Sequence, residues 1–274
     1  MPASLQFIYR RWFQVFSIGV ILFFGTQQVL KFTGNINFIP VIILLGACVV
    51  PAAFVVYFYG QERIVDKVKH MDVPFDTVVA CFIVGGVIGV TVSGFIEYET
   101  LLNIPLLNLF GISVIEEVAK LILPIAVYIR GRYRSETDGL LFGVASGMGF
   151  AAIETMGYGM AAFIKSHGDM RTLEELLLVR GLLSPVGHAA WTGLVCAALW
   201  RQREQSRKLF NPSIMGVFLL TVVLHTVWDI ASSTNKTLIA FPSYAIIGGA
   251  SLTLLVRRLK ESKQLTLKKL SFFN

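Results

Sequence analysis

Long apolar runs dominate this chain of 274 residues and limit what it can fold into. A helix needs roughly 20 apolar residues to cross a hydrocarbon layer roughly 30 Å thick. We expect eight such helices, near 12–30, 39–59, 76–95, 104–129, 139–164, 182–200, 213–233 and 238–256. Charged residues make up 15% of the chain, against about 25% in soluble proteins. This composition excludes a soluble enzyme, a nucleic-acid-binding protein and a disordered protein as first interpretations.

The predicted fold is all-α: a polytopic membrane helix bundle with about eight transmembrane helices. We expect one integral membrane domain over 1–264 and a cytoplasmic tail at 265–274. Within the polar stretch 165–181, Leu173, Leu176 and Leu177 predict a short amphipathic helix on the outer surface. The three cysteines lie inside apolar runs without metal-binding spacing, so we expect buried thiols.

Basic residues lie mainly on one side of the predicted membrane. Eight spans place both termini on the same side, which carries 18 Lys and Arg residues against 5 on the other. An excess of Lys and Arg marks the cytoplasmic side of a membrane. We therefore expect both termini to be cytoplasmic.

Ionisable side chains inside the spans are concentrated in spans four to seven. Each costs at least about 2.5–3.5 kcal/mol at mid-bilayer, so each is a functional candidate. Span four carries Glu116, Glu117 and Lys120, span five Glu154, span six His188, and span seven His225 and Asp229.

Helix geometry allows these side chains to meet. Glu116 and Lys120 are four residues apart and share a helix face, as do His225 and Asp229. With a rise of about 1.5 Å per residue, the titratable residues lie roughly 6–18 Å below the outer surface. One polar cavity in the outer half of the membrane can therefore contain them.

Span five carries a stripe of glycines on the same helix face as Glu154. Gly139, Gly143 and Gly147 are spaced by four residues, and Glu154 follows seven residues after the last of them. Glycines at this spacing let helix backbones approach closely. We expect this face of span five to turn towards the bundle interior.

Such a cluster has the groups needed to activate water. A carboxylate can take a proton as water attacks a carbonyl, and a second polar group can stabilise the oxyanion. Glu116 and Glu117 are adjacent and point about 100° apart on a helix. One can act as the base while the other pairs with Lys120, and the sequence leaves open which does which.

The order of the motifs resembles that of the PrsW family of bacterial intramembrane proteases. The motifs are Glu116-Glu117-Val118-Ala119-Lys120, Phe150 with Glu154, His188, and His225 with Asp229. That family is related to the CAAX prenyl endopeptidases and the wider CPBP group of glutamic membrane proteases. The resemblance covers about half the chain, spans four to seven.

The resemblance implies an endopeptidase of the bacterial cell membrane, without a cofactor. It would cleave a membrane-anchored protein near the extracytoplasmic side, with a regulatory protein such as an anti-sigma factor as substrate. It implies that Glu116 activates the water, with Glu117 and Lys120 completing the first motif and His188 and His225 as the catalytic imidazoles.

Two positions depart from the related enzymes. Glu154 stands where the CAAX enzymes have histidine, and Asp229 where they often have asparagine. A carboxylate cannot donate a hydrogen bond to an oxyanion unless it is protonated, so the mechanism need not transfer unchanged. Phe150 and Arg180, the latter at the predicted outer interface, are supporting candidates.

Other interpretations remain open at this point. His188, His225, Glu154 and Asp229 are possible zinc ligands, although the chain contains no HExxH motif. Intramembrane Glu, His and Asp residues also occur in transporters and proton relays. A catalytically inactive membrane scaffold of the same fold is the third alternative. In every case the expected partners are the lipid bilayer and membrane proteins, not nucleic acid.

Overall fold

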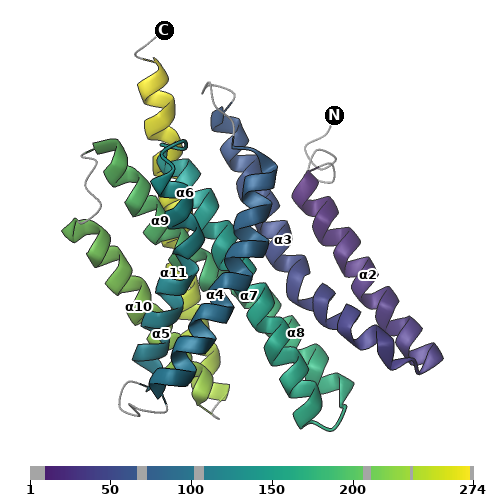
Figure 1. Cartoon of the computed structure of the whole chain (residues 1–274). Coiled ribbons are helices and arrows are strands. Elements are labelled where there is room, and N and C mark those ends of the chain that lie inside the picture. The colour runs from purple at the N-terminus through teal and green to yellow at the C-terminus, as the bar shows by residue number, and fades with distance from the viewer. Residues whose placement is uncertain (1–9, 67–72, 102–107, 206–210, 235–236, 272–274) are drawn as a thin grey trace.

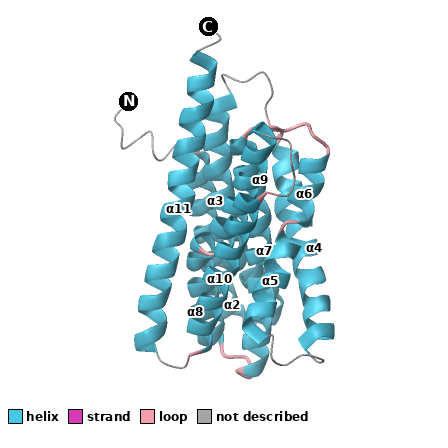
Figure 2. Cartoon of the chain, turned by 90° about the vertical axis from the view of Figure 1, so that its left-hand side faces the viewer, coloured by secondary structure: helices cyan, strands magenta, loops and turns pink. Residues whose placement is uncertain are grey.

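The fold is a bundle of helices, seen in a computed structural model that describes residues 10–66, 73–101, 108–205, 211–234 and 237–271 (Figure 1). The helices are α2 (Arg11–Thr33), η1 (Ile36–Phe38), α3 (Ile39–Asp66), α4 (Phe75–Leu101), α5 (Asn108–Lys120), α6 (Ile122–Ile129), α7 (Glu136–Lys165), α8 (Met170–Leu183), η3 (Ser184–Val186), α9 (His188–Gln205), α10 (Pro212–Ser233) and α11 (Thr237–Ser271). No strand occurs among these residues (Figure 2), which confirms the predicted all-α fold.

Seven helical segments among the described residues are long and apolar enough to cross a membrane. The predicted span 104–129 is not one of them, because it is divided into α5 and α6, with 13 and 8 residues. Together α5 and α6 still lead the chain from one end of the bundle to the other (Figure 1). The chain therefore crosses the bundle eight times, and α2 begins at the same end at which α11 finishes.

The break between α5 and α6 has a local cause. Pro124 has no backbone N–H, so it cannot donate to the carbonyl of Lys120 four residues earlier. The hydroxyl of Ser146 on α7 donates to that carbonyl instead, at 2.7 Å. The amide of Leu121 donates to Val118 at 3.1 Å, which tightens the last turn of α5. Lys120 thus lies at the carboxyl end of a helix, where the helix dipole favours a cation.

Most of the polar stretch 165–181 belongs to α8, which continues to Leu183. The predicted amphipathic helix exists, but Leu173 and Leu177 are buried against Ile42 and Ile43 of α3. One face of α8 therefore packs into the bundle.

The predicted start of span six at 182 does not coincide with the start of a helix, because α8 continues to Leu183. The chain turns through η3, which contains Pro185, and α9 begins only at His188. His188 therefore lies at the first residue of its helix, directly after the break, and not one and a half turns inside it.

α7 is the central helix and packs against α3, α4, α8 and α9. Its start is fixed by a capping box between Ser135 and Asp138. The glycine stripe faces the bundle interior, as predicted, and it lies against α9. A Cβ at Gly143 would lie 2.6 Å from the carbonyl oxygen of Thr192, and a Cβ at Gly147 would lie 2.3 Å from that of His188. These glycines are therefore required for the close approach of α7 and α9.

We predict that Gly147→Ala destabilises the protein by about 1–3 kcal/mol, because the new methyl group overlaps the backbone of α9. Gly157→Ala is the matched control on the same helix, since no atom lies within 4 Å of its Cβ position. Thermal unfolding in detergent, followed by circular dichroism, measures both variants. Equal stability of the two variants would contradict the close approach.

Candidate active site

Two glutamates and a lysine form a buried ion cluster at the end of α5. The ammonium of Lys120 lies 3.0 Å from Glu116 Oε2 and 2.9 Å from Glu117 Oε1. Lys120 is 0% exposed, and its Nζ also lies 4.4 Å from the centroid of the Phe150 ring on α7. Buried charges are tolerated only when they are paired. Both members of the adjacent glutamate pair therefore share one counterion.

His225 of α10 joins this cluster through Glu117. Its Nδ1 lies 2.9 Å from Glu117 Oε1, and its ring stacks on Trp191 with centroids 4.7 Å apart. An ionised carboxylate only accepts hydrogen bonds, so the geometry places a hydrogen on Nδ1. The other nitrogen, Nε2, faces Asp229 Oδ2 at 3.4 Å and Glu116 Oε2 at 3.6 Å. Glu117 thus orients the imidazole so that Nε2 faces two further carboxylates.

A second group of charges forms where α7, α8 and α9 meet. Arg180 Nη2 lies 2.8 Å from Glu154 Oε2, and Arg180 Nε donates to the hydroxyl of Thr155 at 3.3 Å. The guanidinium also lies 4.2 Å from the centroid of the Tyr158 ring. His188 Nε2 lies 3.4 Å from the same Glu154 oxygen. Arg180, placed at the outer interface by sequence, is therefore the direct counterion of Glu154.

The two groups are neighbours. The rings of His188 and His225 are 5.8 Å apart, and those of Phe150 and His188 are 5.7 Å apart. The structure therefore brings together every residue that the sequence singled out: Glu116, Glu117, Lys120, Phe150, Glu154, Arg180, His188, His225 and Asp229.

Sequence reasoning missed several side chains around this cluster. Glu97 of α4 lies within electrostatic reach of Glu116 and Glu154, and its Oε1 is buried without a hydrogen-bond partner among the described residues. Thr226 of α10 donates to Ser113 of α5 at 3.0 Å. The predicted span ended at 95, so Glu97 fell outside it, whereas α4 continues to Leu101. The sequence therefore offered no sign that this glutamate lies near the cluster.

The fold and the cluster define a polytopic membrane protein whose interior holds carboxylates and imidazoles suited to activating water. The sequence model of the PrsW family intramembrane metalloprotease matches residues 73–256, from before α4 to within α11. The chain belongs to this family, and it is a membrane protease. No curated protein and no solved structure matches the chain.

The family's name implies a metal ion, so the donors must be compared with a metal site. Zinc in a catalytic site takes three protein ligands at about 2.0–2.2 Å and an open position. Among the described residues, no group of three or more His, Cys, Asp or Glu side chains is arranged to hold a metal. Lys120 and Arg180 already neutralise three of the glutamates. This arrangement of side chains does not fit a metal site.

We predict that Lys120→Met destabilises the protein by about 3–5 kcal/mol, because it leaves two buried carboxylates without a counterion. The control is Arg171→Met, which breaks the exposed pair of Arg171 with Glu175 and should cost about 0–1 kcal/mol. Unfolding of the purified variants in detergent measures both. Adding Glu117→Gln to Lys120→Met should restore part of the loss, and similar stability of the Lys120 and Arg171 variants would contradict the pairing.

Proposed function

We propose that this membrane protease is an intramembrane endopeptidase that cleaves a membrane-anchored protein with a water molecule activated by Glu116. The assignment of Glu116 as the base rests on how exposed the three charged side chains of α5 are. Glu116 is 8% exposed, whereas Glu117 is 1% and Lys120 0% exposed. A general base must reach the proton of a water molecule, and of these groups Glu116 has the most accessible surface.

Glu117 has a positioning role in this proposal. It lies between Lys120 and His225, with its Oε1 at 2.9 Å from both partners. A carboxylate on Nδ1 fixes the orientation of an imidazole and leaves Nε2 for proton transfer. This arrangement supports Glu116 as the base and Glu117 as the group that orients His225.

The reaction then follows the positions of the two imidazoles. Glu116 takes a proton from a water molecule while the oxygen of that water attacks the scissile carbonyl. His225 Nε2, 3.6 Å from Glu116 Oε2, relays that proton to the leaving amine as the C–N bond breaks. His188 and Arg180 face the cluster from the α8–α9 side and supply hydrogen-bond donors for the oxyanion. This assignment avoids Glu154 and Asp229 as donors, since a carboxylate must be protonated to donate.

The location of the cluster supports cleavage on the extracytoplasmic side of a bacterial cell membrane. Asp229 lies four residues before the end of α10 at Ser233. Figure 1 shows that α10 ends on the side of the bundle opposite to the start of α2. The excess of basic residues on the side of the α2 start supports a cytoplasmic location for that end of the bundle. The proposed substrate is a regulatory protein with a membrane anchor, such as an anti-sigma factor.

We predict that Glu116→Gln abolishes cleavage, with a loss of at least the roughly 10²–10⁴-fold typical of a general base. The amide keeps the shape of the side chain but cannot accept the proton. Glu116→Asp should retain a trace of activity, because a displacement of about 1 Å can cost around 10²-fold. The measurement is cleavage of a single-span substrate in reconstituted vesicles, normalised to folded protein.

Glu117→Gln is the matched variant at the adjacent position. It should keep more turnover than Glu116→Gln but lower the amount of folded protein, because Lys120 loses one partner. Near wild-type turnover in Glu116→Gln, together with an inactive Glu117→Gln, would reverse the two roles.

The absence of a metal is a separate prediction. If Glu116 activates water unaided, purified active protein contains far less than one zinc per chain and keeps its activity in the presence of a chelator. Elemental analysis measures the zinc content directly. About one zinc per chain, lost in both His188→Ala and His225→Ala, would instead establish the metalloprotease mechanism that the family's name implies.

A further inference from the structure

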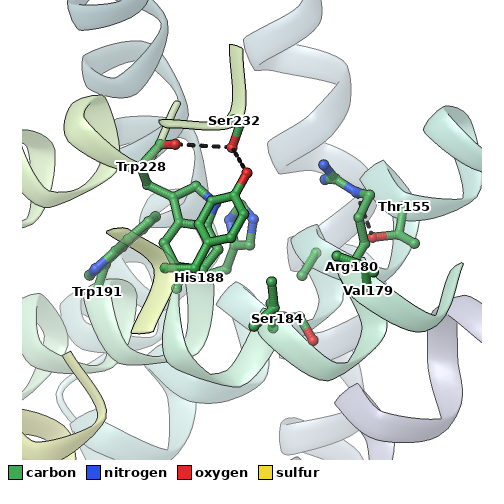
Figure 3. A pocket seen from close by; sticks show the side chains of 12 residues that line it. Thr155, Val179, Arg180, Ser184, His188, Trp191, Trp228 and Ser232 are labelled. Atoms are coloured by element: carbon green, nitrogen blue, oxygen red, sulfur yellow. Dashed lines mark hydrogen bonds between the residues drawn. The ribbon is translucent and has the colours of Figure 1, made fainter. Parts of the chain in front are cut away.

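A cavity of about 160 Å³ adjoins the candidate active site, with His188 in its wall. Figure 3 shows His188, Trp191 and Trp228 on one side of it and Arg180 with Thr155 on the other. Trp228 and Tyr244 come from α10 and α11, and their rings are 4.5 Å apart. The cavity therefore lies where α7, α8 and α9 face the last two helices.

The cavity has the size of one side chain. A protein cavity of about 150 Å³ with an apolar lining binds benzene, so a volume of about 160 Å³ accommodates an aromatic ring or a branched aliphatic group. Trp191, Trp228 and Tyr244 present aromatic surface to it, and such rings gain most from edge and offset contacts with another ring.

A charged occupant is disfavoured by the same residues. Arg180 is the guanidinium in the wall, and it already pairs with Glu154 at 2.8 Å and lies over the Tyr158 ring. An acidic side chain would have to compete with Glu154, and a basic one would lie beside Arg180. Burial of a charge without a partner is costly, so the chemistry favours an uncharged apolar group.

The cavity lies next to the two imidazoles of the candidate active site. His188 lies in the cavity wall and is also within 3.4 Å of Glu154, with its ring 5.8 Å from that of His225. A side chain in the cavity would hold its own peptide unit beside these imidazoles. A cavity in this position would select which peptide bond of an extended segment lies beside the two imidazoles.

We propose that this cavity is the specificity pocket of the protease and binds one aromatic or branched aliphatic side chain of the substrate next to the scissile bond. The inference rests on the proposed function and adds the substrate preference. Exposed residues on two helices form its rim, with Val179 on α8 and Ser232 on α10. A bulky residue at the rim should therefore narrow the pocket without disturbing the buried core.

The test uses Ser232→Trp with Ser233→Trp as its control. Both serines are exposed near the end of α10, and each hydroxyl donates to a carbonyl of its own helix at 2.9 Å, but Ser232 lines the cavity and Ser233 does not. The probe is a set of single-span peptides in vesicles, each with Ala, Leu, Phe or Asp at one position near the bond that wild type cleaves. The readout is the ratio of kcat/KM for Phe over Ala.

Wild type should prefer Phe or Leu to Ala and Asp at one position by about tenfold or more, the effect that a fitted apolar pocket gives. Ser232→Trp should reduce the Phe-to-Ala ratio at that position at least about tenfold, and Ser233→Trp should leave it unchanged. Trp228→Ala enlarges the pocket and should shift the preference in the opposite direction, towards a Trp side chain.

Cleavage without a preference at any position, or equal ratios in the two serine variants, would overturn the pocket while leaving the protease mechanism intact. Failure of wild type to cleave any membrane-anchored protein would overturn the proposed function itself, and the pocket with it.

Discussion

The buried ammonium of Lys120 is the interaction on which the site depends. It is inaccessible to solvent and lies within 3.0 Å of two carboxylates from its own helix. Burial of one of these charges alone would be costly, so the three must fold together. Because Glu117 also contacts His225, the same pairing fixes α10 relative to α5. The ion cluster therefore holds α5 and α10 together and also forms part of the candidate active site.

Close helix packing brings the charges at α7, α8 and α9 next to the ion cluster of α5 and α10. Small residues at helix interfaces allow backbones to approach in a membrane, where apolar side chains gain little by leaving lipid. Gly147 lets α7 contact the backbone of His188 directly, and Ser146 beside it satisfies the carbonyl that Pro124 leaves free on Lys120. Two adjacent residues of α7 thus position one charged group from α5 and one imidazole from α9.

Sequence alone predicted the helical bundle, the identities of the clustered residues and the inward face of α7, because apolar length, misplaced charge and glycine spacing are local signals. It did not predict that α9 starts at His188 or that α5 stops at Lys120. Apolar runs continue through both breaks, and the breaks depend on Pro185 and Pro124 in their packed surroundings. Glu97 was missed because its role depends on how α4 packs, which no periodicity reveals. The catalytic roles themselves stay predictions.

The composition of the cluster has a consequence for charge balance. Glu116, Glu117, Glu154 and Asp229 are four acids, and Glu97 adds a fifth nearby, whereas Lys120 and Arg180 are the two cations in contact with them. In a low-dielectric interior an excess of negative charge is costly, so the site depends heavily on its two cations. Loss of Lys120 leaves the acids of α5 without their contact to an ammonium, and loss of Arg180 leaves Glu154 without its guanidinium. Each cation therefore limits how many carboxylates this part of the bundle can hold.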